Sequence, residues 1–332
     1  MPITARKGFL GGALGCLLAV SVAASATPAF AVGHSLRPSK ASTSSPTSTV
    51  SDTAWVHTRS VGPARTEVRD AAGLLMATFT DGSRSVVVTG PLRTFREGGT
   101  TATVTTPSWA RLLPSPFAGV VDPAWLTAAL IDRSPDVLSV ALQYVTGAPT
   151  LRAADGSVLA VDASYGPLVG GVRQEGSDWN DFLQVAASYD GVLDRPEREQ
   201  TGALDCSGFV RMVFGRRSGY PMVLLPDGVR LPRRATQMHT GGPGTLVSSS
   251  RTRLIDLSHL LPGDLVLFDA STDDGAAVDH VGIYLGTDAG GSPRFVSSRK
   301  AVDGPTLGDT GGRSTLTGTG LYATSLRAIR RI

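Results

Sequence analysis

The chain has 332 residues, of which 41% are hydrophobic and 18% charged, so it holds enough apolar material for a sizeable core and is not a disordered protein. This length suits two domains better than one. The net charge is only +3 and the arginines are spread along the chain, which excludes the basic footprint of a nucleic-acid-binding protein.

The first 31 residues have the order of a secretory signal peptide. Arg6 and Lys7 form a basic start, residues 8–22 are apolar, and residues 29–31 read Ala-Phe-Ala, the small-residue pattern of a cleavage site. The apolar run is shorter than the ~20 residues that span a bilayer. We therefore expect signal peptide 1–31, export, and no stable membrane association after cleavage.

Residues 32–64 are expected to be a linker, because Ser, Thr and Pro dominate its first part and cannot bury a core. Residues 65–170 predict a small α+β domain, in which we find no pattern of metal ligands. Its expected elements are a hairpin of two strands, a third strand and two helices that begin with proline: 74–80, 84–89, 101–106, 123–131 and 135–145.

A second α+β domain is expected over residues 177–332. Apolar residues recur at helical spacing from Trp179 to Tyr189, with Ser177 as the expected N-cap and Gly191 as the stop. A further helix is expected to begin after Asp205. It is followed by strand-like segments, among them 279–286, 294–298 and 322–332.

Cys206 is the single cysteine that remains once residues 1–31 are removed, so no intrachain disulfide is possible. Such a thiol is reactive, bridges to another chain, or is buried and inert. Asp205 is a good N-cap residue and places Cys206 in a first helical turn, where free N–H groups lower a thiol pKa and can hold an oxyanion. Of the five histidines only His280 starts a predicted strand, which makes it the candidate base.

Four segments resemble, in order, the NlpC/P60 family: Leu-Asp-Cys-Ser-Gly-Phe-Val at 204–210, Leu-Pro-Arg at 231–233, Pro-Gly-Asp-Leu-Val-Leu-Phe at 262–268 and Asp-His-Val-Gly-Ile-Tyr at 279–284. The resemblance implies a papain-like domain, with an N-terminal catalytic helix packed on an antiparallel sheet, preceded by the small α+β domain. It implies a secreted or wall-associated cysteine endopeptidase, without a cofactor, that hydrolyses peptidoglycan stem peptides, often after D-γ-glutamate.

By position in the family's motifs, Cys206 is the nucleophile and His280 the general base. The family usually has a third polar residue, often His, after the histidine strand, and here Ser297 occupies that position. Its hydroxyl would accept a hydrogen bond from Nδ1–H of His280 and leave Nε2 facing the thiol. Asp194 and Pro196 stand where the family usually has Tyr and Trp, so this pocket wall is expected to differ.

Two other functions stay open at this stage. A papain-like domain that has lost activity would serve as a wall-binding or scaffold protein, and an amidase or acyltransferase would use the same Cys–His chemistry. Residues 65–170 would position substrate or bind the wall. The sequence does not determine the bond cleaved or the oligomeric state.

Overall fold

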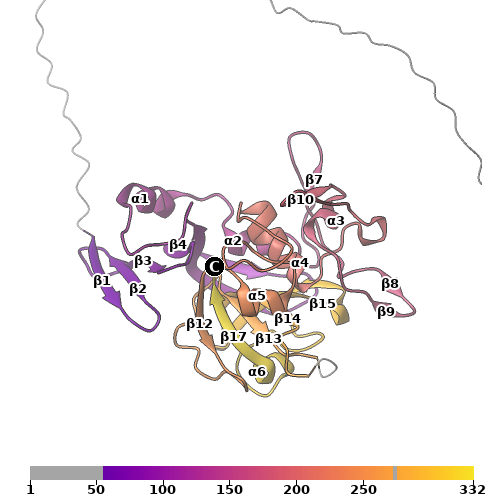
Figure 1. Cartoon of the computed structure of the whole chain (residues 1–332). Helices are drawn as coiled ribbons and strands as arrows, with labels where there is room; N and C mark the ends of the chain where they lie inside the picture. The colour runs from indigo at the N-terminus through magenta and orange to yellow at the C-terminus, as the bar shows by residue number, and fades with distance from the viewer. Residues whose placement is uncertain (1–54, 272–274) are drawn as a thin grey trace, which may run out of the picture. The chain divides into compact units, whose positions relative to one another are not determined.

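The computed structural model describes residues 55–271 and 275–332 (Figure 1). The expected signal peptide and most of the expected linker lie outside the described residues. The described residues belong to one compact unit. The division of this unit into domains 65–170 and 177–332 stays a prediction.

Five strands that are consecutive in the sequence form an antiparallel sheet, in the order β1-β2-β3-β4-β5. Their bounds are β1 Val56–Ser60, β2 Arg65–Arg69, β3 Leu75–Thr80, β4 Ser85–Arg96 and β5 Thr103–Leu112. The linker prediction is wrong for β1, which pairs along its whole length with β2. Every residue of β1 is exposed, so the strand is held in place by its backbone pairing with β2. Its sequence has no alternation of buried and exposed residues from which a strand could have been predicted.

The predicted hairpin between β3 and β4 is confirmed, with Ala77 opposite Val88. Helix α1, Pro123–Ile131, has the predicted bounds, and the Asp122 side chain caps it by accepting from the N–H of Ala124 at 2.8 Å. Helix α2, Val137–Ala141, is shorter than predicted. These helices follow the sheet and pack against its strands β4 and β5.

Short hairpins and turns, rather than one long helix, connect α2 to the cysteine motif. The elements are β6 Leu151–Arg152, β7 Val158–Ala160, β8 Leu168–Val169, β9 Val172–Arg173, α3 Trp179–Leu183, β10 Ala187–Tyr189, β11 Val192–Asp194 and the 3-10 turn η1 Arg198–Gln200. The predicted N-cap Ser177 is wrong by one residue, because the Asp178 side chain caps α3. The helix predicted over 177–191 is also wrong beyond Leu183, because Gln184 adopts a left-handed conformation (φ 55°). Trp179 still reaches Tyr189, whose hydroxyl accepts from the indole N–H at 2.9 Å, so the apolar spacing reflects a helix packed on a hairpin.

A second antiparallel sheet has six strands in the order β12-β17-β13-β14-β15-β16. Their bounds are β12 Thr245–Ser249, β13 Leu265–Phe268, β14 His280–Thr287, β15 Pro293–Arg299, β16 Gly304–Thr306 and β17 Leu326–Arg331. Strand β17, the last in the sequence, therefore lies between β12 and β13. The strand predicted over 322–332 is wrong at its start, where Leu321–Ser325 form helix α6.

The cysteine helix α4, Cys206–Val210, continues as a π-helical turn, η2, over Arg211–Arg217. It packs against β14 and β15 of the six-stranded sheet. The remaining elements are α5 Ala235–Gly241 and the 3-10 turn η3 Lys300–Val302. The predicted helix after Asp205 and the predicted strand starting at His280 are thus both confirmed.

One hydrophobic core joins the two sheets. It includes Val104 of β5, Leu138 of α2, Phe209 of α4 and Leu285 of β14, none of which is measurably exposed. A fully buried ion pair, Arg331 with Asp264 at 2.7 Å, lies close to this junction, where Arg331 also donates to Thr80 Oγ1 at 2.5 Å. The cysteine helix is therefore supported by apolar contacts that come from both sheets.

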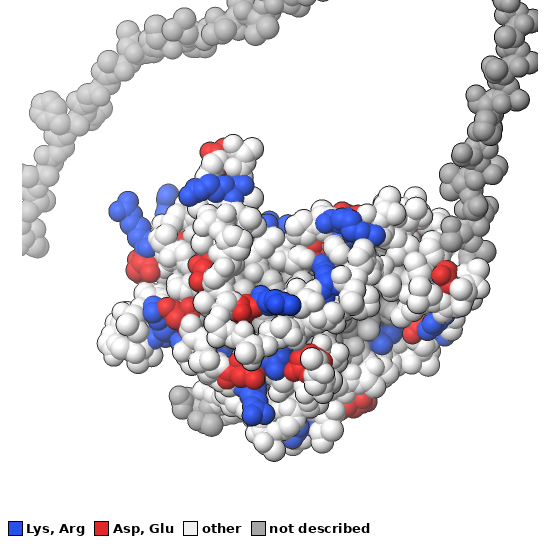
Figure 2. All heavy atoms as spheres, turned by 180° about the vertical axis from the view of Figure 1, so that it is seen from behind, with Lys and Arg blue, Asp and Glu red and all other residues white. Residues whose placement is uncertain are grey.

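Basic and acidic side chains are interspersed on the face shown in Figure 2, without an extended patch of one sign. Within residues 55–271 and 275–332, no helix combines the length and the apolar character that a membrane crossing requires.

Candidate active site

Cys206 is the first residue of α4, and Asp205 is its N-cap. The Asp205 carboxylate accepts from the N–H of Gly208 at 2.7 Å and from that of Gly176 at 3.0 Å. A β-carbon at residue 208 would collide with the carbonyl oxygen of Ser177, so only glycine lets the helix approach the chain there. In the sequence Asp-Cys-Ser-Gly, the aspartate thus caps the start of the helix and the glycine lets it pack closely against Ser177.

The thiol of Cys206 faces the start of β14. Its sulfur lies 3.8 Å from the carbonyl oxygen of Asp279, to which it donates. The backbone N–H of Val281 also points at the sulfur and favours the thiolate. Both groups flank His280 in the sequence, so α4 and β14 bring the cysteine and the histidine segment together. The Asp279 carboxylate instead accepts from the N–H groups of Ala270 and Ser271.

His280 is nearly buried, with 9% of its surface exposed, and its ring is held by two neighbouring elements. The ring centroid lies 5.2 Å from that of Tyr322 in α6, and Nε2 lies 3.0 Å from the hydroxyl oxygen of Ser297 in β15. The expected contact through Nδ1 is therefore wrong. Val296 pairs with Ile283, three residues beyond His280 along β14, so Ser297 does not lie directly opposite the histidine and the ring reaches it with its far nitrogen.

Arg299 is a residue of this site that the sequence reasoning missed. It is 2% exposed, and its Nε–H donates to Ser297 Oγ at 3.0 Å. Its other N–H groups donate to the carbonyl of Gly312 at 2.6 Å and to Ser314 Oγ at 2.6 Å, and the guanidinium lies 4.4 Å from the centroid of the Tyr322 ring. Period-two alternation along β15 puts residues 297 and 299 on one face, and that pattern could have found it.

Burial sets the protonation of both candidate catalytic groups. Burial, followed by the neighbouring Asp205 carboxylate, raises the pKa of the Cys206 thiol to about 12. Burial, followed by the Arg299 cation, lowers the pKa of His280 to about 3. The expectation of a lowered thiol pKa is therefore wrong, because the sulfur is buried and because the residue that caps the helix also places a negative charge beside it. At neutral pH both groups are uncharged.

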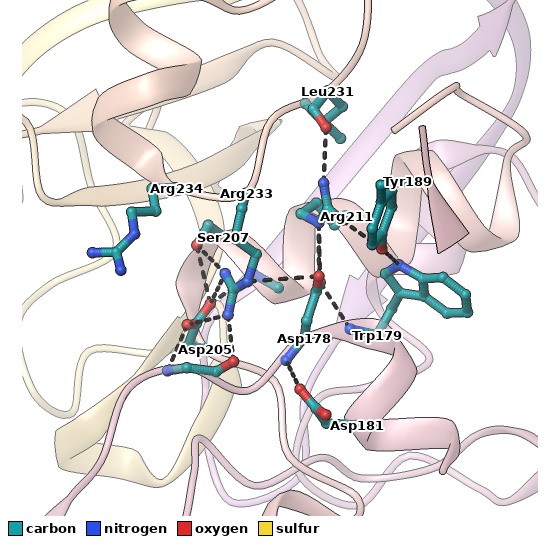
Figure 3. Close-up of polar contacts among 12 residues, drawn as sticks. Asp178, Trp179, Asp181, Tyr189, Asp205, Ser207, Arg211, Leu231, Arg233 and Arg234 are labelled. Carbon is teal, nitrogen blue, oxygen red and sulfur yellow. Dashed lines mark hydrogen bonds and ion pairs between the residues drawn. The ribbon is translucent and has the colours of Figure 1, made fainter. Parts of the chain in front are cut away.

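A network of buried charges lies next to the cysteine helix (Figure 3). Arg233 donates to both carboxylate oxygens of Asp205, at 3.2 and 2.8 Å, and to Ser207 Oγ at 2.8 Å. Burial opposes ionisation of Asp205, but Arg233 and the two backbone N–H groups outweigh it, so the pKa of Asp205 is lowered.

A second buried pair lies beside the first. Arg211 donates from Nε to Asp178 at 2.9 Å and from Nη2 to the Tyr189 hydroxyl at 2.6 Å. The two arginines thus fix α4 and the preceding loop from two sides. They are paired and mostly buried, which leaves neither free to bind a substrate group.

A cavity of about 560 Å³ opens over the thiol. Cys206, Ser207 and Val278 line it together with Tyr165 and Glu175, whereas Asp194 and Pro196 are not among its lining residues. The cavity wall expected from Asp194 and Pro196 is therefore formed by Tyr165 and Glu175, which precede them in the sequence.

Arg234 also lines the cavity, and its guanidinium points away from the network, as Figure 3 shows. Among the described residues Arg234 takes part in none of the ion pairs, which leaves a cation available to an anionic ligand. The described residues contain no group of three or more His, Cys, Asp and Glu side chains placed to hold a metal ion.

Comparison with known proteins relates one segment of the chain to a family. No curated protein matches the chain. A solved structure, described as similar to lipoprotein, NLP/P60 family, from Staphylococcus aureus subsp. aureus Mu50, is 18% identical with a TM-score of 0.29. The match covers 63% of this chain and about half, 48%, of that one. Residues 189–299, which include Cys206, His280 and Ser297, match the model of the NlpC/P60 family. The chain therefore carries an NlpC/P60 family domain.

Proposed function

We propose that the protein is a secreted or wall-associated cysteine endopeptidase that hydrolyses amide bonds in peptidoglycan stem peptides. NlpC/P60 domains act on the cell wall in general, and the family match covers the segment that holds both reactive groups. The observation that carries the proposal is the thiol of Cys206, which starts a helix, lines an open cavity and faces the strand that begins with His280.

The proposed reaction is acyl transfer through a thioester. Because Nε2 of His280 is occupied by Ser297, Nδ1 is the nitrogen left to accept the thiol proton. The sulfur attacks the substrate carbonyl, and the N–H groups of the first turn of α4 stabilise the resulting oxyanion. The imidazolium then protonates the leaving amine as the C–N bond breaks, and water hydrolyses the thioester with His280 again acting as the base.

The cavity favours a substrate that carries a carboxylate. Arg234 supplies a cation at its lining that no described side chain neutralises, whereas Arg233 is already paired with Asp205. The stem peptides proposed as substrates contain D-γ-glutamate, which is linked to the next residue through its γ-carboxyl group. During cleavage of that amide bond, its free α-carboxylate would face Arg234. Guanidinium–carboxylate hydrogen bonds are charge-assisted, and so they orient as well as attract the substrate.

Tyr165 and Glu175 extend this site beyond the matched segment 189–299. We propose that residues 65–170 serve the reaction by completing the cavity wall and positioning the substrate. This role is favoured over wall binding at a distance because Tyr165 lines the cavity itself.

The decisive experiment is incubation of the protein with purified peptidoglycan, followed by mass spectrometry of the soluble fragments. New amino termini within the stem peptide, absent with Cys206→Ala, are the expected result. Products cut between the glycan and the peptide would instead identify an amidase, and transfer of the acyl group to an added amine would identify an acyltransferase. Fragments that persist in Cys206→Ala would overturn the cysteine mechanism.

A catalytically weak wall-binding protein is the second candidate, and one observation favours it. The thiol has its pKa raised to about 12 and donates to the Asp279 carbonyl, so no thiolate–imidazolium pair exists at rest. This candidate predicts that the protein sediments with peptidoglycan but releases no fragments, and that Cys206→Ala binds equally well.

A further inference from the structure

The Arg299 guanidinium is a buried cation that takes part in none of the ion pairs among the described residues. It donates to four neutral acceptors, from Ser297, Gly308, Gly312 and Ser314. Burial lowers the pKa of Arg299 to about 10, which leaves it charged at neutral pH. Burying an unpaired charge is costly in free energy. The position of Arg299, two residues after Ser297 in β15, therefore suggests a role other than packing.

We propose that Arg299 is a positioning residue that acts through Ser297 to keep the imidazole of His280 neutral. The inference deepens the proposed function and rests on it only for the role of His280 as the general base.

The geometry opposes the imidazolium in two ways. Ser297 Oγ already accepts the Nε–H of Arg299 at 3.0 Å, so its bond to the Nε2–H of His280 can strengthen less when the ring becomes an imidazolium. The second reason is charge, because Arg299 places a positive charge one hydrogen bond behind the serine. Like charges at such distances disfavour the second ionisation, and burial of the ring strengthens the repulsion.

The charged groups that face His280 come from two elements. Asp205, at the start of α4, favours the imidazolium, and Arg299 of β15 opposes it. The side chains packed on the ring from β13 and α6, Phe268 and Tyr322, are an apolar ring and a phenol whose pKa is raised by burial. Burial and Arg299 together prevail over Asp205, and the pKa of His280 is lowered to about 3.

Glu97 connects this arrangement to the five-stranded sheet. Its carboxylate accepts from the N–H of Gly308 at 3.2 Å, while the carbonyl of the same residue accepts from Arg299 Nη1 at 3.4 Å. Gly308 thus links Glu97 to Arg299 through two hydrogen bonds. The Glu97 carboxylate partly balances the Arg299 cation.

The test is a ¹⁵N nuclear magnetic resonance titration of the histidine side chains, with His280 assigned from its absence in His280→Asn. In the wild-type protein we expect His280 to stay neutral down to at least pH 4. In Arg299→Met, which keeps the length and removes the charge, its pKa should rise by on the order of one unit or more. Iodoacetamide should then alkylate Cys206 faster at pH 7, because an ion pair with the imidazolium has become more favourable.

Arg299→Lys is the matched control, because it keeps the charge and loses the Nε–H contact, and it should keep most of the low pKa. An equal rise in Arg299→Lys and Arg299→Met would attribute the effect to repacking and would overturn the proposal. So would an unchanged pKa in a folded Arg299→Met. The wild-type titration tests the proposal even where Arg299→Met does not fold, since a His280 pKa near 6.5 would contradict it. None of these measurements needs a substrate, so a failure of this proposal can be distinguished from a failure of the proposed peptidase activity.

Discussion

Arg233 forms a two-pronged contact with Asp205, whose oxygens lie 3.2 and 2.8 Å from its Nη1 and Nη2 atoms, immediately before the helix that Cys206 begins. Asp205 is 5% exposed and also holds the N–H of Gly208. The same carboxylate therefore caps α4, anchors an arginine and raises the pKa of the thiol beside it. Asp205 therefore affects both the stability of the fold and the reactivity of the thiol.

Arg233→Met should destabilise the protein by about 3 kcal/mol, because it leaves Asp205 buried without its cation. Urea unfolding followed by circular dichroism measures the loss. Arg251→Met, at an exposed position outside the network, is the matched control and should change little. Equal midpoints for the two variants would mean that the buried pair contributes nothing net.

Asp205 should also make stability depend on acid. Its pKa is lowered in the folded protein, so its contribution is fully present above the unfolded value of about 3.9 and is lost as the pH falls through the folded value. We expect the difference in unfolding free energy between wild type and Asp205→Asn to shrink from pH 5 to pH 2. A difference that stays constant over this range would show that Asp205 is not ionised in the fold.

Alkylation of Cys206 by iodoacetamide should be slow at pH 7 and should accelerate only above the ~8.5 midpoint of a free thiol. The reason is burial and the Asp205 carboxylate, which raise the thiol pKa to about 12. The measurement is the alkylation rate between pH 5 and pH 10 by intact-protein mass spectrometry, with a denatured sample as the reference. A midpoint below 8.5 in the native protein would reveal a stabilised thiolate.

Ser297→Ala should reduce the rate on a defined stem peptide by roughly two- to tenfold. It removes one hydrogen bond to the ring of His280, worth about 0.5–1.5 kcal/mol, and each 1.36 kcal/mol is tenfold in rate. Ser297→His, which would restore the family's usual residue, should not rescue activity. The site is fully buried and the oxygen is shared with Arg299, so a larger side chain has no room. Activity at or above the wild-type level in Ser297→His would contradict this packing argument.

Arg234→Gln should lower kcat/KM for a stem peptide with a free D-glutamate α-carboxylate by about ten- to a hundredfold. This is the range of ~1.5–3 kcal/mol for a hydrogen bond to a charged group. The same peptide with that carboxylate amidated should lose much less, since it cannot form the ion pair. Equal losses on both peptides would place Arg234 outside substrate recognition. Arg251→Gln, which does not line the cavity, controls for a general change in charge.

The parts of the site that could be predicted are those determined by local sequence. Asp205 specifies a helix start whatever surrounds it, and the strand beginning at His280 follows from its apolar run. The contact between His280 and Ser297 came from the family resemblance, but the nitrogen involved depends on strand register and was predicted incorrectly.

What could not be predicted depends on contacts between distant segments. Arg299 looks like an ordinary strand arginine until Ser297, Gly312 and Ser314 are placed around it. The thiol pKa was predicted in the wrong direction because a helix N-terminus was considered without its burial. Tyr165 reaches the cavity only through the folding of several hairpins, for which single-sequence periodicity holds no signal.

The position of β17 has a consequence for the order in which the protein can be made. This strand is synthesised after all the other strands of its sheet, yet it separates β12 from β13. A ribosome that has not yet translated residues 326–331 therefore holds a sheet with its interior strand missing, and β13 lacks a neighbour on one side. The strand that begins with His280 is next to β13. Until translation has passed β17, the sheet beside the strand that carries His280 therefore stays incomplete.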